Sequence, residues 1–275
     1  MTGRALVLRS HGPIPDAVAD SLRASGMTAL WEVGPTQWRA YFTDTAPDPV
    51  YALRKRHPEI ECGWEEEPAV DWAGRYQSSL RPLAIGRRFA VLPSPALANP
   101  WSERISLRLV PGMAFGTGEH YTTASCLRLL EEMPSSPASV LDVGCGSGIL
   151  AAASCKLGCP SVTACDVDAD ALLVAGETAA ANGVSFRLVE GSAAQVEGEF
   201  GLVFANILAE TLEAILPDLA ARLAPGGLLA GSGIASGRQG DVLAAASSLG
   251  LVLIESRTDG EWWTLLWRAP LSRMD

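Results

Sequence analysis

The second half of the chain alternates between short apolar runs and longer segments whose apolar residues recur at helical spacing. The apolar runs predict five strands, at residues 139–143, 161–166, 186–190, 202–206 and 228–234. The segments between them predict four helices, at residues 150–157, 169–182, 208–223 and 239–249. We expect Gly158, Gly183 and the pair Pro225-Gly226 to end the first three helices, as glycine often does. Strands that alternate with helices form mostly parallel sheets, so this half predicts an α/β fold.

The last two predicted strands are joined differently. They cover residues 251–257 and 262–268 and flank Asp259-Gly260, a dipeptide typical of tight hairpin turns. We therefore expect the parallel sheet to finish with an antiparallel hairpin strand.

The first 64 residues predict a separate, small α+β domain. Strand, helix, strand, strand, helix and strand are expected at residues 5–9, 15–25, 29–33, 38–42, 49–56 and 59–64. This order is that of the ferredoxin-like, split βαβ unit. Because residues 1–64 contain no glycine loop and no metal-ligand spacing, we expect this domain to bind a partner rather than to carry out chemistry.

A charged segment with prolines separates the two domains. Residues from Val70 to Leu80 include apolar positions at helical spacing before Pro82, which predicts a linker helix within residues 65–84. Strands are then predicted at residues 87–92 and 105–110. We place the second domain at residues 85–275.

Composition is that of a globular protein with a large core. Of the 275 residues, 48% are hydrophobic and 19% charged, and no apolar run approaches the ~20 residues of a membrane span. The N-terminus shows no export or transit signal, so we expect a cytoplasmic protein without membrane contact. Six cysteines without a C-x-x-C pair, and only three histidines, predict reduced thiols and no metal site.

The chain is acidic, with a net charge of −10 and a pI near 4.9. This charge argues against nucleic acid as a partner, because nucleic-acid binding needs a basic surface. It is compatible with a basic protein partner, whose opposite field would speed association. The alternative is that the acidity only keeps the protein soluble.

The stretch from Val140 to Leu150 carries the clearest chemical signal. It reads V-L-D-V-G-C-G-S-G-I-L, so a buried strand bearing Asp142 runs into a glycine-rich turn and then a helix. Glycines let a ligand approach the backbone, and the free N–H groups of the helix face it. The third glycine comes one residue too early for the dinucleotide fingerprint G-x-G-x-x-G. The spacing resembles the first motif of class I S-adenosylmethionine-dependent methyltransferases, with Gly144 and Gly146 beside the cofactor.

Two acids follow from this interpretation. Asp142 either orients the glycine turn or pairs with the ammonium group of the ligand, and the sequence leaves both roles open. Asp166 ends the next strand, where a carboxylate can accept hydrogen bonds from both ribose hydroxyls of an adenosine. The alternative role, capping the helix at 169–182, suits Asp168 better.

Asn206 ends the strand at 202–206. Its side-chain carbonyl can hold an amine N–H so that the nitrogen lone pair points at the methyl donor. Ile207 and Leu208 follow it, so the Pro-Pro of DNA-adenine methyltransferases is absent. Capping of the helix at 208–223 is the alternative role for Asn206.

A second candidate ligand loop lies upstream, at residues 111–123, with the sequence P-G-M-A-F-G-T-G-E-H-Y-T-T. Its aromatic residue, Phe115, could cover a flat ring or the methyl group. The alternative is a flexible loop that Thr122 caps at the start of the following helix.

Several motifs together resemble the ribosomal protein L11 methyltransferase family (PrmA). They are the loop at 111–123, L-D-V-G-C-G-S-G-I-L, A-N-I-L-A, G-G-L-L-A-G-S-G-I and the closing E-W-W-T-L-L-W-R. The likeness covers roughly residues 67–268. It implies a class I, Rossmann-like methyltransferase that uses S-adenosylmethionine and trimethylates amino groups of a large-subunit ribosomal protein.

The resemblance also implies roles for single residues and domains. Cofactor contacts fall on Thr123, Gly144, Asp166 and Asn206, and Phe115 lies over the cofactor. The N-terminal domain would recognise the protein substrate and swing relative to the catalytic domain.

Methyl transfer to an amine needs the neutral nitrogen, so a lysine with a pKa of about 10.4 must first lose a proton. Burial beside a sulfonium favours this loss, and His120 is the one candidate base near the site. We expect alignment and desolvation of the amine to provide most of the rate acceleration. We also expect the protein to be a monomer. The rival readings are a protein-lysine methyltransferase with another target, a small-molecule N-methyltransferase and a non-catalytic scaffold in ribosome assembly.

Overall fold

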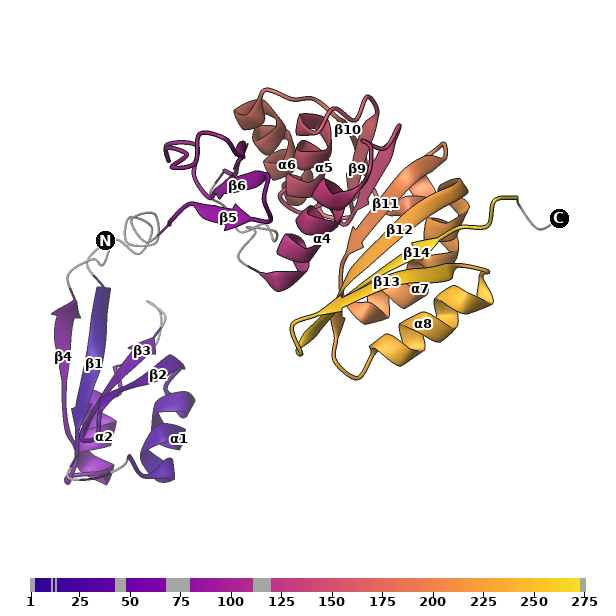
Figure 1. Cartoon of the computed structure of the whole chain (residues 1–275). Coiled ribbons are helices and arrows are strands. Elements are labelled where there is room, and N and C mark those ends of the chain that lie inside the picture. The colour runs from indigo at the N-terminus through magenta and orange to yellow at the C-terminus, as the bar shows by residue number, and fades with distance from the viewer. Residues whose placement is uncertain are drawn as a thin grey trace. The chain divides into compact units, whose positions relative to one another are not determined.

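A computed structural model describes residues 3–10, 12, 14–42, 48–67, 80–110 and 120–272. The chain divides into two compact units, Met1–Tyr76 and Gln77–Asp275, each with its own core (Figure 1). The linker helix expected within residues 65–84 falls largely on positions 68–79, which lie outside the described residues. Among the described residues, no helix is long and apolar enough to span a bilayer.

The first unit is a four-stranded antiparallel sheet with two helices. In chain order its elements are β1 (Gly3–Arg9), α1 (Asp16–Ala24), β2 (Met27–Gly34), β3 (Gln37–Phe42), α2 (Val50–Arg56) and β4 (Glu61–Glu67). The strands lie in the order β2-β3-β1-β4. Alternate side chains of β1, Leu6 and Leu8, form a core with Leu22 of α1 and Leu53 of α2. Both helices therefore cover the same face of the sheet.

The second unit is built on a seven-stranded sheet. Its strands are β8 (Val140–Val143), β9 (Val162–Asp166), β10 (Arg187–Glu190), β11 (Phe200–Asn206), β12 (Leu223–Ala235), β13 (Val252–Thr258) and β14 (Trp262–Arg268). They lie in the order β10-β9-β8-β11-β12-β14-β13. Only β14 is reversed, being antiparallel to both β12 and β13. The mostly parallel α/β sheet and its antiparallel hairpin strand are confirmed.

The helices of this unit follow the predicted alternation. They are α4 (Tyr121–Glu132), α5 (Ile149–Lys156), α6 (Ala169–Asn182), the 3₁₀ helix η1 (Ala193–Gln195), α7 (Ala209–Ala221) and α8 (Gln239–Ser248). Helix α6 has the predicted bounds because both ends carry local signals. Asp168 accepts a hydrogen bond from the N–H of Asp170, and Gly183 adopts the left-handed conformation that ends a helix.

The expected end of α7 at Pro225-Gly226 is wrong. The helix ends at Ala221, and both residues of the pair lie inside β12. The reason is tertiary, because Leu223 already pairs with Phe200 of the neighbouring strand β11.

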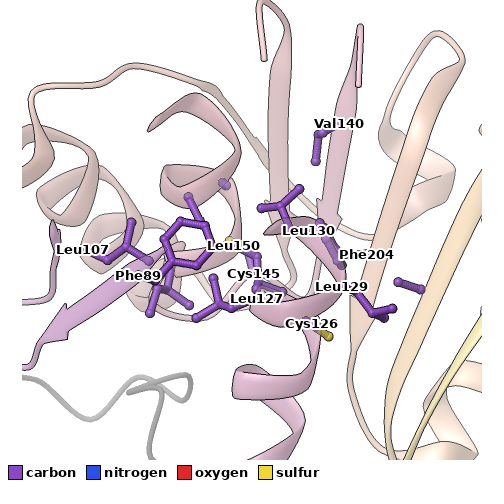
Figure 2. Close-up of a cluster of buried hydrophobic side chains, with 14 of the residues drawn as sticks. Phe89, Leu107, Cys126, Leu127, Leu129, Leu130, Val140, Cys145, Leu150 and Phe204 are labelled. Carbon is purple, nitrogen blue, oxygen red and sulfur yellow. The ribbon is translucent and has the colours of Figure 1, made fainter. Parts of the chain in front are cut away.

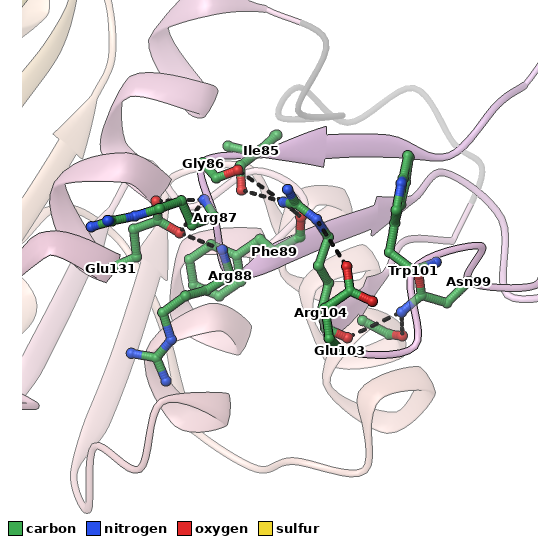
Figure 3. A network of polar contacts seen from close by, with 11 residues as sticks. Ile85, Gly86, Arg87, Arg88, Phe89, Asn99, Trp101, Glu103, Arg104 and Glu131 are labelled. Carbon is green, nitrogen blue, oxygen red and sulfur yellow. Dashed lines mark hydrogen bonds and ion pairs between the residues drawn. The ribbon is translucent and has the colours of Figure 1, made fainter.

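A small sheet precedes α4, formed by β5 (Leu83–Ile85), β6 (Phe89–Leu92) and β7 (Ile105–Arg108). The strand predicted at 87–92 starts later, because Arg87 and Arg88 lie in a turn between β5 and β6. The carboxylate of Glu131 on α4 accepts the backbone N–H groups of both arginines, at 2.8–3.1 Å (Figure 3). Arg104 donates to the carbonyls of Gly86 and Phe89 at 2.9 and 3.0 Å (Figure 3).

The small sheet and the seven-stranded sheet share one hydrophobic core. Phe89 and Leu107 of the small sheet pack with Leu127 of α4, Leu150 of α5 and Phe204 of β11 (Figure 2). All five side chains are at most 3% exposed. The N-terminus of α4 lies at the end of β11, where Thr123 accepts a hydrogen bond from Asn206.

Candidate active site

The candidate site lies at the carboxyl ends of the parallel strands. The chain order of the strands reverses between β8 and β11, and ligands of open α/β sheets bind at such a switch point. A cavity of about 620 Å³ opens there. Its described lining residues are His120, Thr122, Val143, Gly144, Gly146, Asp166, Val167, Gly191, Ser192, Asn206, Ile207, Leu208, Thr211, Ile215, Gly233 and Trp262.

The glycine turn after β8 has the predicted backbone geometry. Gly144, Gly146 and Gly148 have φ angles of +67°, +51° and +72°, which side chains rarely adopt. A Cβ on Gly144 would lie 2.5 Å from Cγ2 of Ile207, and one on Gly148 would lie 2.9 Å from Cβ of Ala175. The turn is therefore restricted to glycine both by conformation and by close packing.

Asp166 bridges this turn to the next one. Its Oδ2 accepts the N–H of Gly146 at 2.9 Å, and its Oδ1 accepts the N–H of Asp168 at 3.0 Å. Asp168, and not Asp166, caps helix α6. Each oxygen of the Asp166 carboxylate keeps a further lone pair, and the residue lines the cavity. This arrangement suits the acceptance of two ligand hydroxyl groups.

Asp142 is buried beneath the turn, with 1% of its surface exposed. Its Oδ2 accepts the N–H of Ala151 in the first turn of α5 at 3.2 Å. Burial raises the pKa of the Asp142 carboxyl to about 7, the N–H of Ala151 lowers it, and the nearby charge of Asp166 raises it. A small cavity of about 20 Å³ separates Asp142 from Thr123 and Asn206, which is room for one water molecule or a small cationic group.

Asn206 ends β11 and contacts α4. Its Nδ2 donates to Oγ1 of Thr123 at 3.1 Å. Its Oδ1 is buried and has no hydrogen-bond partner among the described residues. Helix α7 begins after Leu208 without a side-chain cap, so Asn206 does not serve as its N-cap. A buried amide oxygen without a partner carries a desolvation cost that a ligand N–H would relieve.

The predicted loop at 111–123 is described only from His120 onward, and Phe115 lies outside the described residues. Thr122 is not the cap of α4. The N-cap is His120, whose Nδ1 contacts Oγ1 of Thr122 at 2.8 Å and accepts its N–H. The imidazole also packs edge-to-face against Trp262, with ring centroids 5.0 Å apart.

Nδ1 of His120 accepts a hydrogen bond in this geometry, so the neutral ring carries its proton on Nε2. That tautomer does not favour His120 as a base. The thiols beside the glycine turn are no nucleophiles either, because burial raises the pKa of Cys165 to about 12 and also raises that of Cys145.

The cavity includes residues that sequence reasoning missed. Val167, Gly191 and Ser192 directly follow the ends of β9 and β10, so the strand-end rule that found Asp166 could have found them. Gly233 lies inside β12 with a φ of +83°, and a Cβ there would lie 2.3 Å from the carbonyl oxygen of Ile207. Trp262 reaches the cavity from β14, which no local signal indicates.

The residues of this edge fit S-adenosylmethionine. The glycine turn offers a backbone cradle, Asp166 offers acceptors for a ribose, and buried Asp142 offers a carboxyl for a cationic group. When bound, this cofactor supplies a methyl group on a sulfonium for transfer to a nucleophile. Within the described ranges, no three His, Cys, Asp or Glu side chains gather as a metal site would require.

A sheet of this strand order, with a glycine turn after its central strand and an acid after the next, defines a class I S-adenosylmethionine-dependent methyltransferase. The family model described as "Ribosomal protein L11 methyltransferase (PrmA)" matches residues 23–270. The chain belongs to this family, which confirms the resemblance found in its motifs.

Individual relatives agree. The chain is 45% identical over 243 residues to the ribosomal protein L11 methyltransferase of Geobacter metallireducens, covering 84% of this chain and 81% of that one. It is 36% identical over 294 residues to that of Chloroflexus aurantiacus, covering 97% and 83%. The crystal structure of a ribosomal protein L11 methylase from Lactobacillus delbrueckii subsp. bulgaricus superposes with a TM-score of 0.64 at 33% identity, covering 69% of this chain and 99% of that one.

Proposed function

We propose that this methyltransferase modifies amino groups of ribosomal protein L11, at lysine side chains, at the N-terminal α-amine, or at both. The family and the names of the relatives support the protein substrate. The buried, unpartnered Oδ1 of Asn206 supports an amine as the acceptor. This oxygen is a hydrogen-bond acceptor at the cavity, and an amine N–H is the donor that it needs.

The cavity has two halves that suit the two reactants. Residues that follow β8, β9 and β10 include the glycine turn and Asp166, which we assign to the nucleoside. The other half includes Asn206 at the end of β11, Leu208 directly before α7 and Trp262 of β14, and we assign it to the amine. Asn206 lies next to the glycine turn, because β8 and β11 are neighbours, so the amine would meet the cofactor at the switch point.

The amine must be neutral when it attacks. The described residues of the amine half provide no carboxylate, so an ammonium there loses hydration without gaining a counter-charge. This environment lowers the pKa of the amine and releases its proton to water. Asn206 would then hold one N–H through Oδ1 and align the lone pair for in-line attack.

Thr123 keeps this amide in the required orientation. Because its Oγ1 takes the Nδ2 hydrogen bond, Oδ1 is the end of the amide that is left for a ligand N–H. Positioning and desolvation, rather than a dedicated base, therefore account for the proposed catalysis.

We assign recognition of the protein substrate to the N-terminal domain, residues 1–64, joined by the linker at 65–84 to the catalytic domain at 85–275. The first unit has its own sheet and core, and the glycine turn, Asp166 and Asn206 all belong to the second unit, which supports a division of labour. Ribosomal protein L11 is a cytoplasmic protein whether it is newly synthesised or assembled into the ribosome. An enzyme that modifies it would therefore also be cytoplasmic.

Intact-mass spectrometry of purified L11 tests the proposal, after incubation with S-adenosylmethionine and either the wild-type enzyme or the Asp166→Ala variant. We expect a ladder of methyl additions with the wild type and little or none with the variant. No addition by an enzyme that still binds the cofactor would contradict L11 as the substrate. Transfer to another protein or to a small amine would then indicate one of the rival substrates, and binding without any transfer would indicate a scaffold.

A further inference from the structure

The amine half of the cavity contains one aromatic indole, Trp262, on a mostly aliphatic wall. The wall consists of Ile207 and Leu208, which directly precede α7, and of Thr211 and Ile215 on α7. Among the described residues of this half there is no carboxylate. A cation that enters it gains no counter-charge, so the groups left to stabilise it are the Oδ1 of Asn206 and the indole of Trp262.

Trp262 is held rigidly by its strand. Its backbone N–H donates to Oδ1 of Asp259 at 2.8 Å across the hairpin turn, and its backbone pairs with Ala235 of β12. His120 packs against the indole at an angle of 70° between the rings. The ring is thus placed at the cavity before any ligand arrives, which limits the entropy lost on binding.

The two groups recognise different forms of the amine. Asn206 needs an N–H, and the number of N–H groups falls with every methyl that is added. A methylated ammonium is instead a weakly hydrated cation with an apolar surface, which aromatic faces bind well. A fully methylated ammonium has no N–H at all, so only the aromatic contact remains.

We propose that Trp262, with His120 and the α7 wall, forms a subsite for methylated ammonium groups that retains partly methylated substrate for further rounds of transfer. The inference rests on the proposed amine chemistry and adds the residue that governs the extent of methylation. In each round the nitrogen lone pair forms the new N–C bond while the C–S bond breaks with its electron pair going to sulfur. Before each attack, including the third, the amine loses one proton to solvent. The product of the third transfer has no proton left to lose and keeps a permanent positive charge. Every round consumes a fresh S-adenosylmethionine.

Binding of choline to the enzyme loaded with S-adenosylhomocysteine tests the subsite without any protein substrate. Calorimetry measures the choline affinity of the wild type and of each variant. In the wild type, the indole N–H signal of Trp262, one of eight tryptophans and assigned by its loss in Trp262→Phe, reports by NMR whether choline binds beside this ring. We expect choline to bind about 2- to 30-fold more weakly to Trp262→Leu, with Trp262→Phe in between. The uncharged isostere 3,3-dimethyl-1-butanol should bind the wild type more weakly than choline does.

The neighbouring Trp263 provides the matched control. Adjacent strand residues face opposite sides of a sheet, and Trp263 packs with the core on the α7 and α8 side. Trp263→Phe should therefore leave choline affinity within about 2-fold of the wild type, which separates the subsite from a general loss of structure. Equal choline affinity in wild type and Trp262→Leu, or equal affinity for choline and its isostere, would overturn the proposal.

Product analysis links the subsite to turnover. On a protein that the wild-type enzyme methylates, Trp262→Leu should accumulate mono- and dimethyl forms. The third transfer should slow more than the first. Equal slowing of all three transfers contradicts a role in retention. If L11 is not methylated but choline binding still depends on Trp262, the subsite stands and the substrate assignment fails.

Discussion

Nδ2 of Asn206 donates a hydrogen bond of 3.1 Å to Oγ1 of Thr123, which joins the end of β11 to the first turn of α4. The two residues are 83 positions apart in sequence. Thr123 is 1% exposed, so the contact is shielded from water. The bond decides which end of the Asn206 amide is taken by α4, and it leaves the carbonyl oxygen without a partner among the described residues.

Replacing Thr123 tests this orienting contact. Thr123→Val keeps the shape of the side chain but removes the acceptor, so the amide can rotate and present its NH₂ group instead. We expect kcat/KM to fall about 2- to 10-fold, as for the loss of one neutral hydrogen bond, with the loss in kcat rather than in the affinity for S-adenosylhomocysteine. Thr123→Ser keeps the hydroxyl and should restore most of the activity. Equal kcat in both variants would show that the amide orientation does not matter.

Asp166 and Asp168 form a pair that separates cofactor binding from helix capping. Asp166→Asn removes the charge from the two proposed ribose contacts, so calorimetry should show the Kd for S-adenosylhomocysteine rising about 10- to 100-fold. Asp168→Ala removes the N-cap of α6 and should lower the free energy of unfolding by about 1 kcal/mol. Its cofactor affinity should stay close to that of the wild type. The ribose assignment fails if the two variants bind the ligand equally well.

Substitutions at Gly233 and Gly237 distinguish the cost of a Cβ collision from the cost of a positive φ angle. Both have positive φ angles, +83° and +95°, but only at Gly233 would a Cβ collide, 2.3 Å from the carbonyl oxygen of Ile207. Gly237→Ala should lower the free energy of unfolding by about 1–2 kcal/mol, the conformational cost alone. Gly233→Ala should lose a further 1–3 kcal/mol or so, because the backbone next to Asn206 must shift. Urea unfolding measures both, and equal losses would argue against the collision.

Asp142 predicts an unusual pH dependence of stability. Its folded-state pKa, about 7, lies above the ordinary value of 3.8, so the folded state binds more protons between these two values. The free energy of unfolding therefore falls as the pH rises from about 4 to about 7, by on the order of 4 kcal/mol from this group. Asp142→Asn should flatten this part of the urea-unfolding profile. An unchanged profile would show that the carboxyl is not protonated in the folded protein.

The same variant separates the two roles left open for Asp142. If the carboxylate pairs with the ligand ammonium, the affinity for S-adenosylhomocysteine should rise with pH through about 7 in the wild type but not in Asp142→Asn. If Asp142 only orients α5 through the N–H of Ala151, the two proteins should show the same pH dependence of affinity.

Local signals explain why so much could be predicted from the sequence. Asp168 and Gly183 mark the ends of α6, and the glycines of the turn after β8 all adopt the positive φ angles that favour them. Asp166 and Asn206 were found because each directly ends an apolar strand, and parallel strands carry their ligands at that edge. In each case the physical cause lies within a few residues of the feature.

The errors arose where a distant partner decides the local structure. Pro225-Gly226 is a good helix-ending signal, but pairing between Leu223 and Phe200 makes the pair part of a strand. Arg87 and Arg88 suit a strand, but the carboxylate of Glu131, more than 40 residues away, holds their N–H groups in a turn.

The sequence by itself determined the class of fold, the glycine turn and the residue types that surround the cofactor. These features depend on hydrophobic periodicity and on backbone conformations that single residues impose. Only the tertiary structure decided that Thr123 orients Asn206, that His120 rather than Thr122 caps α4, and that Trp262 rather than Trp263 faces the cavity. These outcomes depend on strand order and register, which bring together side chains that are distant in the sequence. Nothing in the local sequence around these residues indicates that they are in contact.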